Sequence, residues 1–197
     1  MMRMLHVVLS LFAFIASVNS QSQEFQKGEV AEKLGIAIDY FTSEKYHEAL
    51  LIFNHLDNEF PLNPRFHAYM GVCQYYEWNY PEAGRLLSEA LPKLGGLAPH
   101  ELSVYYFHCA ESYFYQEKYV EAIPYYEKHT NVCYNHEKGD ALYRIAFCYL
   151  FVGNNATALE YFISSLYYYE KYSGNLTARI TQIKNMINGL SKQNGEP

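Results

Sequence analysis

Two short stretches of sequence decide the fold: Lys45-Tyr46-His47-Glu48-Ala49-Leu50 and Lys118-Tyr119-Val120-Glu121-Ala122-Ile123. Both contain a Lys-Tyr pair that is followed, after one variable residue, by Glu-Ala and an aliphatic residue. Self-similar stretches indicate an internal repeat, and a repeat changes how every other element of the chain is interpreted. Further copies of the pattern are therefore the first feature to expect on either side of Ala49 and Ala122.

Four copies are present. In each copy an alanine has an aromatic residue or Asn three positions before it and a large apolar residue four positions after it. The four sets are Tyr46/Ala49/Phe53, Tyr80/Ala83/Leu87, Tyr119/Ala122/Tyr126 and Asn155/Ala158/Phe162. The alanines are spaced by 34, 39 and 36 residues. A period of this length is typical of arrays of helical hairpins.

A second helix precedes each alanine. Twelve positions before it stands a small residue, preceded by a mid-sized apolar one, and nine positions before it comes Tyr or Gln. The three sets are Ala37, Gly71, Ala110 and Ala146; Ile36, Met70, Cys109 and Ile145; and Tyr40, Gln74, Tyr113 and Tyr149. These positions share one face of a helix with 3.6 residues per turn. Each repeat is therefore predicted to be a helix A, a short turn and a helix B, which cross closely at the small residues.

The stretches around Ala49 and Ala122 resemble the tetratricopeptide-repeat (TPR) signature, and the resemblance covers about residues 30–170. It implies an all-α fold, a right-handed superhelical solenoid of about four helix-turn-helix repeats with a C-terminal capping helix. The expected TPR domain spans residues 21–197, with repeats at about 30–63, 64–97, 103–136 and 139–172.

The chain departs from a regular array in two places. The Gly95-Gly96-Leu97-Ala98-Pro99 segment is expected to lengthen one loop between repeats. After Gly174 and a possible capping Asn175, an apolar stripe predicts a final helix over about 175–190, which covers the open end of the array. The stripe consists of Leu176, Ile180, Ile183, Ile187 and Leu190.

Residues 1–20 have the layout of a secretory signal: a basic start at Arg3, an apolar run from Leu5 to Val18, and a predicted cut after Ser20. The alternative is an uncleaved anchor, but the run is short for a bilayer span. We expect a secreted or periplasmic protein without stable membrane insertion after cleavage. The cut changes the net charge from −6 to −7, which argues against nucleic acid as a partner.

Cysteine and histidine residues raise two alternatives. The even count of Cys73, Cys109, Cys133 and Cys148 permits disulfides in an oxidising compartment, but these positions also suit small buried residues of the repeats. His129, Cys133 and His136 have a spacing that places metal-binding groups along one helix face. Because no fourth ligand is identifiable, we expect no metal and no other cofactor.

Catalytic motifs are not evident. The sequence contains no nucleophile elbow and no phosphate-binding glycine loop. Glu48, Glu82 and Glu121 recur at one repeat position early in helix B, where the helix dipole favours an acid without a catalytic role. The chain is therefore not expected to be an enzyme.

The resemblance implies that helix A of each repeat lines an inner groove in which ligands lie. The corresponding positions are Ala31, Leu34, Ile38, Phe41, Thr42, Arg65, Ala68, Val72, Tyr75, Tyr76, Val104, Phe107, Glu111, Phe114, Tyr115, Asp140, Tyr143, Phe147, Leu150 and Phe151. Nine of these twenty are aromatic, against 17% for the whole chain. Arg65 is the only base, so a clamp for terminal carboxylates, as in the chaperone-docking members of the family, is not expected. An aromatic wall instead suits an apolar or amphipathic segment.

The predicted partner-binding residues are Phe41, Arg65, Tyr75, Tyr76, Phe107, Glu111, Tyr115, Tyr143 and Phe147. Among the rings, Tyr75, Tyr76, Tyr115 and Tyr143 are expected to contact the partner, whereas Phe114, Phe147 and Phe151 are expected to pack between helices.

The predicted function is that of an exported scaffold or adaptor that binds a protein or peptide segment through this groove. The alternative is a glycan- or cell-wall-binding module, since sugar rings also stack on aromatic side chains. Against it, the single tryptophan, Trp78, lies in a predicted turn and not in the groove.

Overall fold

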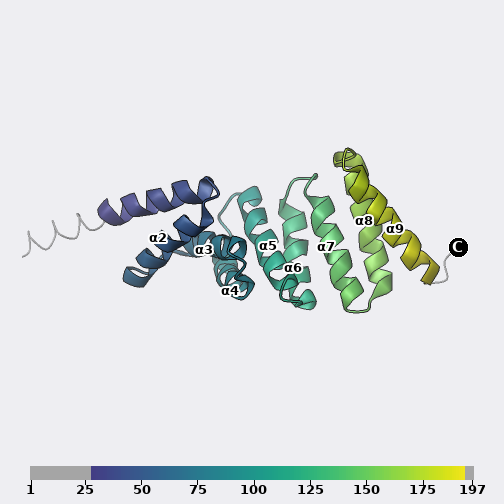
Figure 1. Cartoon of the computed structure of the whole chain (residues 1–197), viewed down its shortest axis with the longest axis horizontal. Helices are drawn as coiled ribbons and strands as arrows, with labels where there is room; N and C mark the ends of the chain where they lie inside the picture. Colours follow the sequence, from purple (N-terminus) through teal and green to yellow (C-terminus); the bar gives the residue numbers. More distant parts are fainter. Residues whose placement is uncertain (1–27, 194–197) are drawn as a thin grey trace, which may run out of the picture. The chain divides into compact units, whose positions relative to one another are not determined.

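The computed structural model describes residues 28–193; residues 1–27, which include the predicted signal segment, and residues 194–197 lie outside the described part. All regular secondary structure within residues 28–193 is helical (Figure 1). The predicted all-α fold class is therefore confirmed. Among these described helices, none combines the length and apolar character that a bilayer span requires.

The chain forms two compact units that divide after Pro61. The first unit consists of a helix over residues 28–42 and of α2 (Tyr46–Glu59). Ala37 of the first helix and Ala49 and Phe53 of α2 are fully buried. This hairpin is the first predicted A/B pair, with its small residues in the core as expected.

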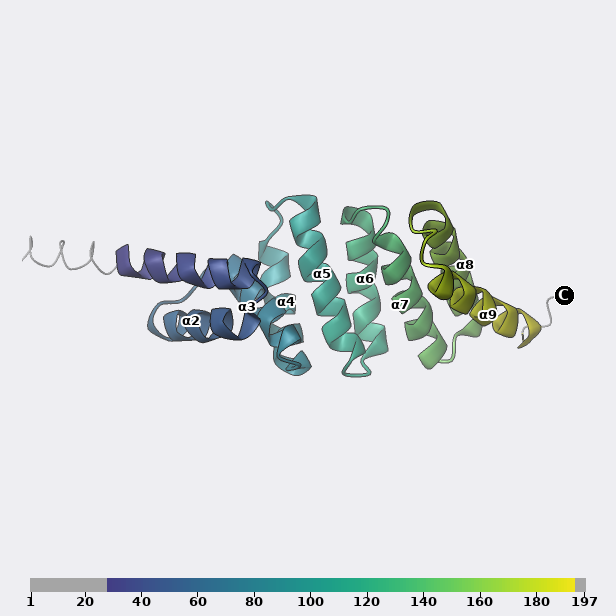
Figure 2. The ribbon, with the colours of Figure 1, turned by 45° about the horizontal axis from the view of Figure 1, so that its top comes forward.

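The second unit begins at Leu62 and contains three further A/B pairs and a final helix. The A helices are α3 (Pro64–Tyr76), α5 (Pro99–Phe114) and α7 (Lys138–Phe151), the B helices are α4 (Tyr80–Ala90), α6 (Tyr119–Val132) and α8 (Asn155–Tyr172), and the last helix is α9 (Thr177–Gln193). Each helix packs against the next one along the chain, and Figure 2 shows α5 to α9 in this succession. Between α4 and α5, a short 3-10 turn, η1 (Leu91–Lys93), and the predicted glycine-rich loop lengthen the connection.

Every A helix ends in the same way. In α3, the amide of Asn79 donates to the carbonyl of Gln74 at 2.9 Å, and the amide of Trp78 donates to Tyr75 at 3.0 Å. This pair of bonds is a Schellman motif, which requires a left-handed residue between helix and turn. That residue recurs at one repeat position, as Glu44 (φ 60°), Trp78 (φ 62°), Glu117 (φ 60°) and Gly153 (φ 79°). The turn is thus part of the repeat, although only its last copy has the usual glycine.

Small residues lie where helices A and B touch. Ala83, Ala122 and Ala158 are fully buried. A Cβ atom on Gly71 of α3 would lie 2.6 Å from Cγ of Leu87 of α4, so a side chain at this position would force the helices apart. These contacts agree with the register predicted from the sequence.

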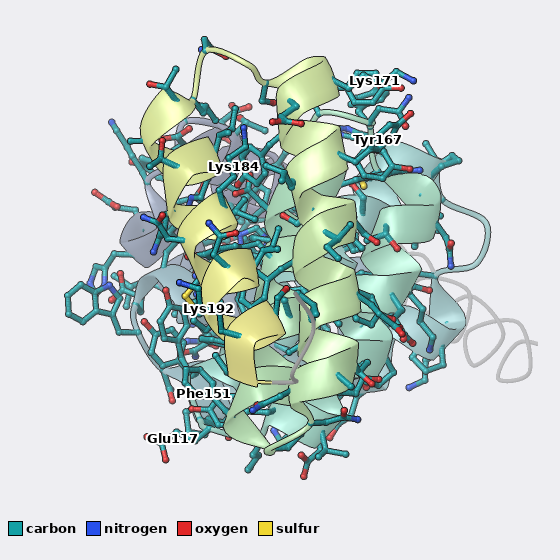
Figure 3. All side chains as sticks on the ribbon, turned by 90° about the vertical axis from the view of Figure 1, so that its right-hand side faces the viewer. Glu117, Phe151, Tyr167, Lys171, Lys184 and Lys192 are labelled. Carbon is teal, nitrogen blue, oxygen red and sulfur yellow. The ribbon has the colours of Figure 1, made fainter. Side chains whose placement is uncertain are left out.

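The final helix covers the last A/B pair, as predicted. Ile183 and Leu190 of α9 are buried in one apolar cluster with Tyr143, Phe162 and Tyr169 of α7 and α8. Figure 3 shows α9 running alongside α8. Two details differ from expectation: α9 begins at Thr177, so that Asn175 lies in the preceding turn, and Leu176 is exposed.

Candidate functional site

The candidate site is the face of α3, α5 and α7 in the second unit, where most of the predicted contact residues lie. Phe41 belongs to the first unit, where its ring packs edge-on against Tyr46 at 5.8 Å. The predicted role of Phe41 in binding stays a prediction.

A cluster of tyrosines joins α3, α4 and α5. Its members, here called the tyrosine cluster, are Tyr75, Tyr76, Tyr80 and Tyr115. Tyr75 lies in the middle, with its ring centroid 5.3 Å from that of Tyr76, and burial raises its pKa. Tyr115 stacks on Tyr80 at 4.7 Å and is 46% exposed. Tyr76 and Tyr115 thus present accessible rings, whereas Tyr75 supports them from within.

A buried ion pair links α5 to α7 beside this cluster. Nε of Arg144 lies 2.8 Å from Oε1 of Glu111, and its Nη2 donates to Oε2 at 2.9 Å. The hydroxyl of Tyr126 from α6 also donates to the Glu111 carboxylate. Glu111 is only 2% exposed. Burial raises the pKa of Glu111, while Arg144 opposes this shift. The carboxylate is thus enclosed and positions Arg144, and a contact of Glu111 with a partner stays a prediction.

Arg144 in turn fixes two rings of α5. Its guanidinium lies 4.7 Å from the ring centroid of Phe114 and 5.7 Å from that of Tyr115, and it donates to the Tyr115 hydroxyl at 3.3 Å. Such contacts restrict the rotamers of the rings. Arg144 was not among the predicted site residues, since nothing in its local sequence indicates that it pairs with an acid 33 residues away.

A pocket of about 430 Å³ opens at the C-terminal ends of α5 and α7. We call it the arginine pocket, because Arg144 and Arg179 of α9 both line it, together with Glu117. Its aromatic lining consists of Phe114, Tyr115, Tyr119, Tyr143, Phe147 and Phe151. Figure 3 shows Glu117 and Phe151 near each other at this end of the unit.

Two side chains of this pocket differ in exposure from what their expected roles suggest, and those roles stay predictions. Tyr143, expected to be a contact, is only 7% exposed, because the guanidinium of Arg179 lies over its ring at 4.4 Å and Phe162 packs beside it. Phe151, expected to pack internally, is 52% exposed at the end of α7. Phe147 lies half-buried between the rings of Tyr143 and Phe162.

A second pocket, of about 250 Å³, lies toward the N-terminal ends of α5 and α7. We call it the histidine pocket. It is lined by Ser103, Val104, Phe107 and His108 of α5, by His129 of α6, and by Glu137 and Asp140 at the start of α7. The predicted contact residue Phe107 forms part of its wall, with its ring centroid 5.2 Å from that of His129.

Both histidines of this pocket are neutral at neutral pH. Burial lowers the pKa of His108 to about 4, and burial also lowers the pKa of His129. Nδ1 of His108 lies 2.7 Å from the carbonyl oxygen of Val104, and Nδ1 of His129 lies 2.9 Å from that of Ser103. Since carbonyls only accept hydrogen bonds, each Nδ1 carries the proton and each Nε2 is an acceptor.

Arg65, the only base among the predicted groove positions, is paired with an acid. Its guanidinium makes two hydrogen bonds to Glu101 of α5, at 2.7 and 3.1 Å, and lies 5.8 Å from the ring centroid of Tyr69. The side chain therefore joins neighbouring A helices, although it remains exposed.

The histidine and cysteine side chains of α6 do not form the row that their spacing indicates. α6 ends at Val132, so His136 lies beyond the helix and stacks near Tyr134, while His129 is buried. Within residues 28–193, no three His, Cys, Asp or Glu side chains are arranged to hold a metal ion.

All four cysteines are free thiols. Burial raises the pKa of the Cys73 and Cys148 thiols to about 12. Thiols in such surroundings are unreactive, which agrees with the interpretation of these residues as small buried side chains.

Comparisons with known proteins agree with this architecture. The family model of the coatomer epsilon subunit matches residues 36–97. No curated protein sequence matches the chain.

Solved structures are similar over most of the chain. The crystal structure of MamA protein has a TM-score of 0.59 at 17% identity and covers 74% of this chain and 75% of its own. A Podosopora anserina putative kinesin light chain with TPR-like repeats has a TM-score of 0.59 at 12% identity, covering 85% of this chain and 87% of its own. The yeast histone chaperone Hif1, described as a scaffold protein, has a TM-score of 0.67 at 14% identity, covering 83% and 95%. The resemblance seen in the repeat stretches is thus confirmed in the fold: the chain has a TPR-like helical-repeat fold.

Proposed function

We propose that this chain is a protein-interaction scaffold that holds a segment of a partner protein against the face of α3, α5 and α7. The observation that carries the proposal is the set of exposed rings, Tyr76, Tyr115 and Phe151. Tyr115 and Phe151 line the arginine pocket, and Tyr76 belongs to the tyrosine cluster that Tyr115 shares. Aromatic residues of this kind supply a large part of the energy of protein interfaces.

The rings are held in place before any partner arrives. Tyr115 is fixed by its stack on Tyr80 and by the hydrogen bond from Arg144, which is itself fixed by Glu111. A side chain that is already ordered loses little conformational entropy on binding. This arrangement supports a role in recognition, because it lowers the free-energy cost of forming a complex.

The structural neighbours support the same class of function. Hif1 is described as a scaffold that recruits protein complexes to core histones, and this chain has a similar fold. The partner of the present chain need not be related, because function in this fold depends on the residues of the groove. The net charge of −6 further disfavours nucleic acid as the ligand.

We also propose that the protein acts outside the cytoplasm, on the basis of the signal-like residues 1–20. N-terminal sequencing of the protein purified from its native source tests this. A mature chain that begins at Gln21 supports export, and a chain that retains residues 1–20 contradicts cleavage.

Panning of a displayed library of random peptides against the purified chain tests the scaffold function. The affinity of the selected peptides is then measured for the unaltered chain, for Tyr115→Ala and for Phe151→Ala. We expect each change to weaken binding by about tenfold, which corresponds to the loss of one well-packed aromatic contact. The melting temperature should stay constant.

Tyr167→Ala is the matched control. Tyr167 is also an exposed tyrosine, but it lies on α8 outside both pockets and, in Figure 3, at the opposite end from Phe151. An equal loss of affinity in all three variants, or no loss in any, would contradict binding at the proposed face. Selection of glycans but no peptides, by an equivalent glycan array, would favour the glycan-binding alternative.

A further inference from the structure

The histidine pocket contains an acceptor that nothing in the fold uses. His129 is only 4% exposed, and within residues 28–193 its Nε2 atom has no hydrogen-bond partner. Because Nδ1–H is committed to the carbonyl of Ser103, Nε2 carries a lone pair. A buried acceptor without a partner is costly, so its presence at the wall of a pocket indicates a ligand that donates a hydrogen bond there.

Two carboxylates beside His129 add negative charge to the same pocket. Oδ1 of Asp140 accepts a hydrogen bond from the hydroxyl of Tyr169. Glu137 accepts the backbone amide of Tyr134 at 2.8 Å, and its Oε1 lies 3.3 Å from Nε2 of His100. None of the described residues that line the pocket is a lysine or an arginine.

Besides Ser103 and His108, the remaining lining residues are apolar. Val104 and Phe107 of α5 face the same space, whose volume of about 250 Å³ accommodates a butylammonium chain. A lysine side chain matches this combination, because its methylene groups prefer apolar contacts and its ammonium group has three donors. A guanidinium fits less well, since its planar fork pairs best with both oxygens of one carboxylate.

We infer that the histidine pocket binds the ammonium group of a lysine side chain, with His129, Asp140 and Glu137 as its acceptors and Phe107 against its methylene groups. The inference rests on the proposed function for the source of the lysine, a docked protein segment, but the chemistry of the pocket does not depend on it.

The position of the pocket agrees with one bound segment that reaches both sites. Phe107 in the histidine pocket and Phe114 in the arginine pocket are two turns apart on α5, about 10 Å at 1.5 Å per residue. An extended chain covers this distance in about three residues. The segment would therefore place a lysine about three residues away from the side chain that enters the arginine pocket.

A direct test uses Nα-acetyl-lysine N-methylamide as the probe, titrated into the full chain while the side-chain nitrogen signals of His129 are followed by NMR. We expect a saturable shift of Nε2. The norleucine and Nε-acetyl-lysine analogues should bind at least about tenfold more weakly, because both lack the ammonium group. Equal binding of the lysine and norleucine probes, or no saturable shift, overturns the inference.

Asp140→Asn provides the variant arm, because asparagine keeps an acceptor for Tyr169 and removes only the charge. It should weaken the affinity for the lysine probe by about tenfold. Glu160 is an exposed acid on α8 outside the pocket, so Glu160→Gln should have no effect.

Failure of the two proposals is distinguishable. Binding of the lysine probe without any effect of Tyr115 or Phe151 on the selected peptides would refute only the scaffold face. Peptide binding that depends on those rings but not on Asp140 would refute only the lysine pocket.

Discussion

Single residues lower the stability of this fold in two ways, through backbone strain and through burial of charge. The left-handed position at the end of each A helix is occupied by Glu44, Trp78, Glu117 and Gly153, of which only the glycine adopts that conformation without steric penalty. The buried carboxylate of Glu111 requires a cation, which Arg144 supplies from the next A helix. Both features determine where the exposed rings lie, because the first fixes the turns and the second fixes Tyr115.

Gly153→Ala tests the strained turn. A Cβ at this position meets no other atom within 4 Å, so the only penalty is the backbone conformation at φ 79°. We expect the free energy of unfolding to fall by about 1 kcal/mol. Gly189→Ala is the control, since it also meets open space but lies inside α9, where alanine should stabilise the protein by about 0.5–1 kcal/mol. Urea unfolding should therefore give changes of opposite sign; changes of the same sign would refute the assigned turn.

Arg144→Met tests the buried ion pair. The substitution leaves Glu111 enclosed with only the Tyr126 hydroxyl as a partner, and we expect a loss of about 3–5 kcal/mol at neutral pH. Adding Glu111→Gln should recover much of this loss, because no buried charge then remains. A double variant as unstable as the single one would show that lost packing, and not charge, dominates.

The same variant should depend on pH in a defined direction. The pKa of Glu111 in the folded protein is raised above its ordinary value of 4.5. The folded state therefore holds a proton that the unfolded state releases, and this stabilisation is present below pH 4.5 and lost as the pH rises through the folded pKa. Without Arg144 the shift is larger, so the deficit of Arg144→Met should shrink as the pH is lowered toward 4.5. A deficit that is constant with pH, measured by urea unfolding, would argue against a charged Glu111.

At the scale of elements, each helix buries its apolar face only against its neighbours. This leaves the last A/B pair open unless another helix covers it. α9 provides the cover through Ile183 and Leu190, which join the cluster of Tyr143 and Phe162. It also contributes Arg179 to the arginine pocket, so one helix both caps the array and completes a candidate site.

Ile183→Ala tests this cap. Ile183 is fully buried, and its truncation should cost about 2–4 kcal/mol and lower the melting temperature. Ile163→Ala on the exposed face of α8 is the matched control and should change stability by no more than about 0.5 kcal/mol. Deletion of residues 175–197 should be more damaging than either. A truncated chain with an unchanged melting temperature would exclude a capping role for α9.

At the scale of the whole molecule, the net charge of −6 acts on the partner before contact is made. An acidic protein attracts a lysine-bearing segment over a distance set by salt screening, about 10 Å at 0.1 M. Charge thus affects the rate of association more than the final affinity.

The association rate of a selected lysine-containing peptide should therefore fall by several-fold between about 50 mM and 500 mM salt. Stopped-flow fluorescence measures this rate. The same peptide with lysine replaced by norleucine should show a weaker salt dependence. Identical salt profiles for the two peptides would mean that the lysine approaches no negative surface.

The sequence by itself determined the repeat, the A/B helix pairs, the close contacts at Ala83 and Ala122, and the final covering helix. These features follow from local periodicity: residues that are three, four and seven positions apart lie on one helix face, and a small residue is required wherever two helices cross closely. The left-handed turn residue recurs at an equally regular position. Its residue type varies from Glu to Trp to Gly, so the repeat pattern in the sequence did not reveal it.

Only the tertiary structure decided which candidate side chains are accessible. Tyr143 and Phe151 both lie on helix A of the same repeat, yet Arg179 of α9 covers one and leaves the other exposed. Glu111 is enclosed by Arg144 and Tyr126, and Arg65 is paired with Glu101, in each case through contacts with another helix. The free acceptor of His129 exists because the carbonyl of Ser103 takes the other ring nitrogen. The physical reason is that periodicity assigns a residue to a face of its own helix, whereas burial and pairing depend on side chains that the chain brings in from neighbouring helices.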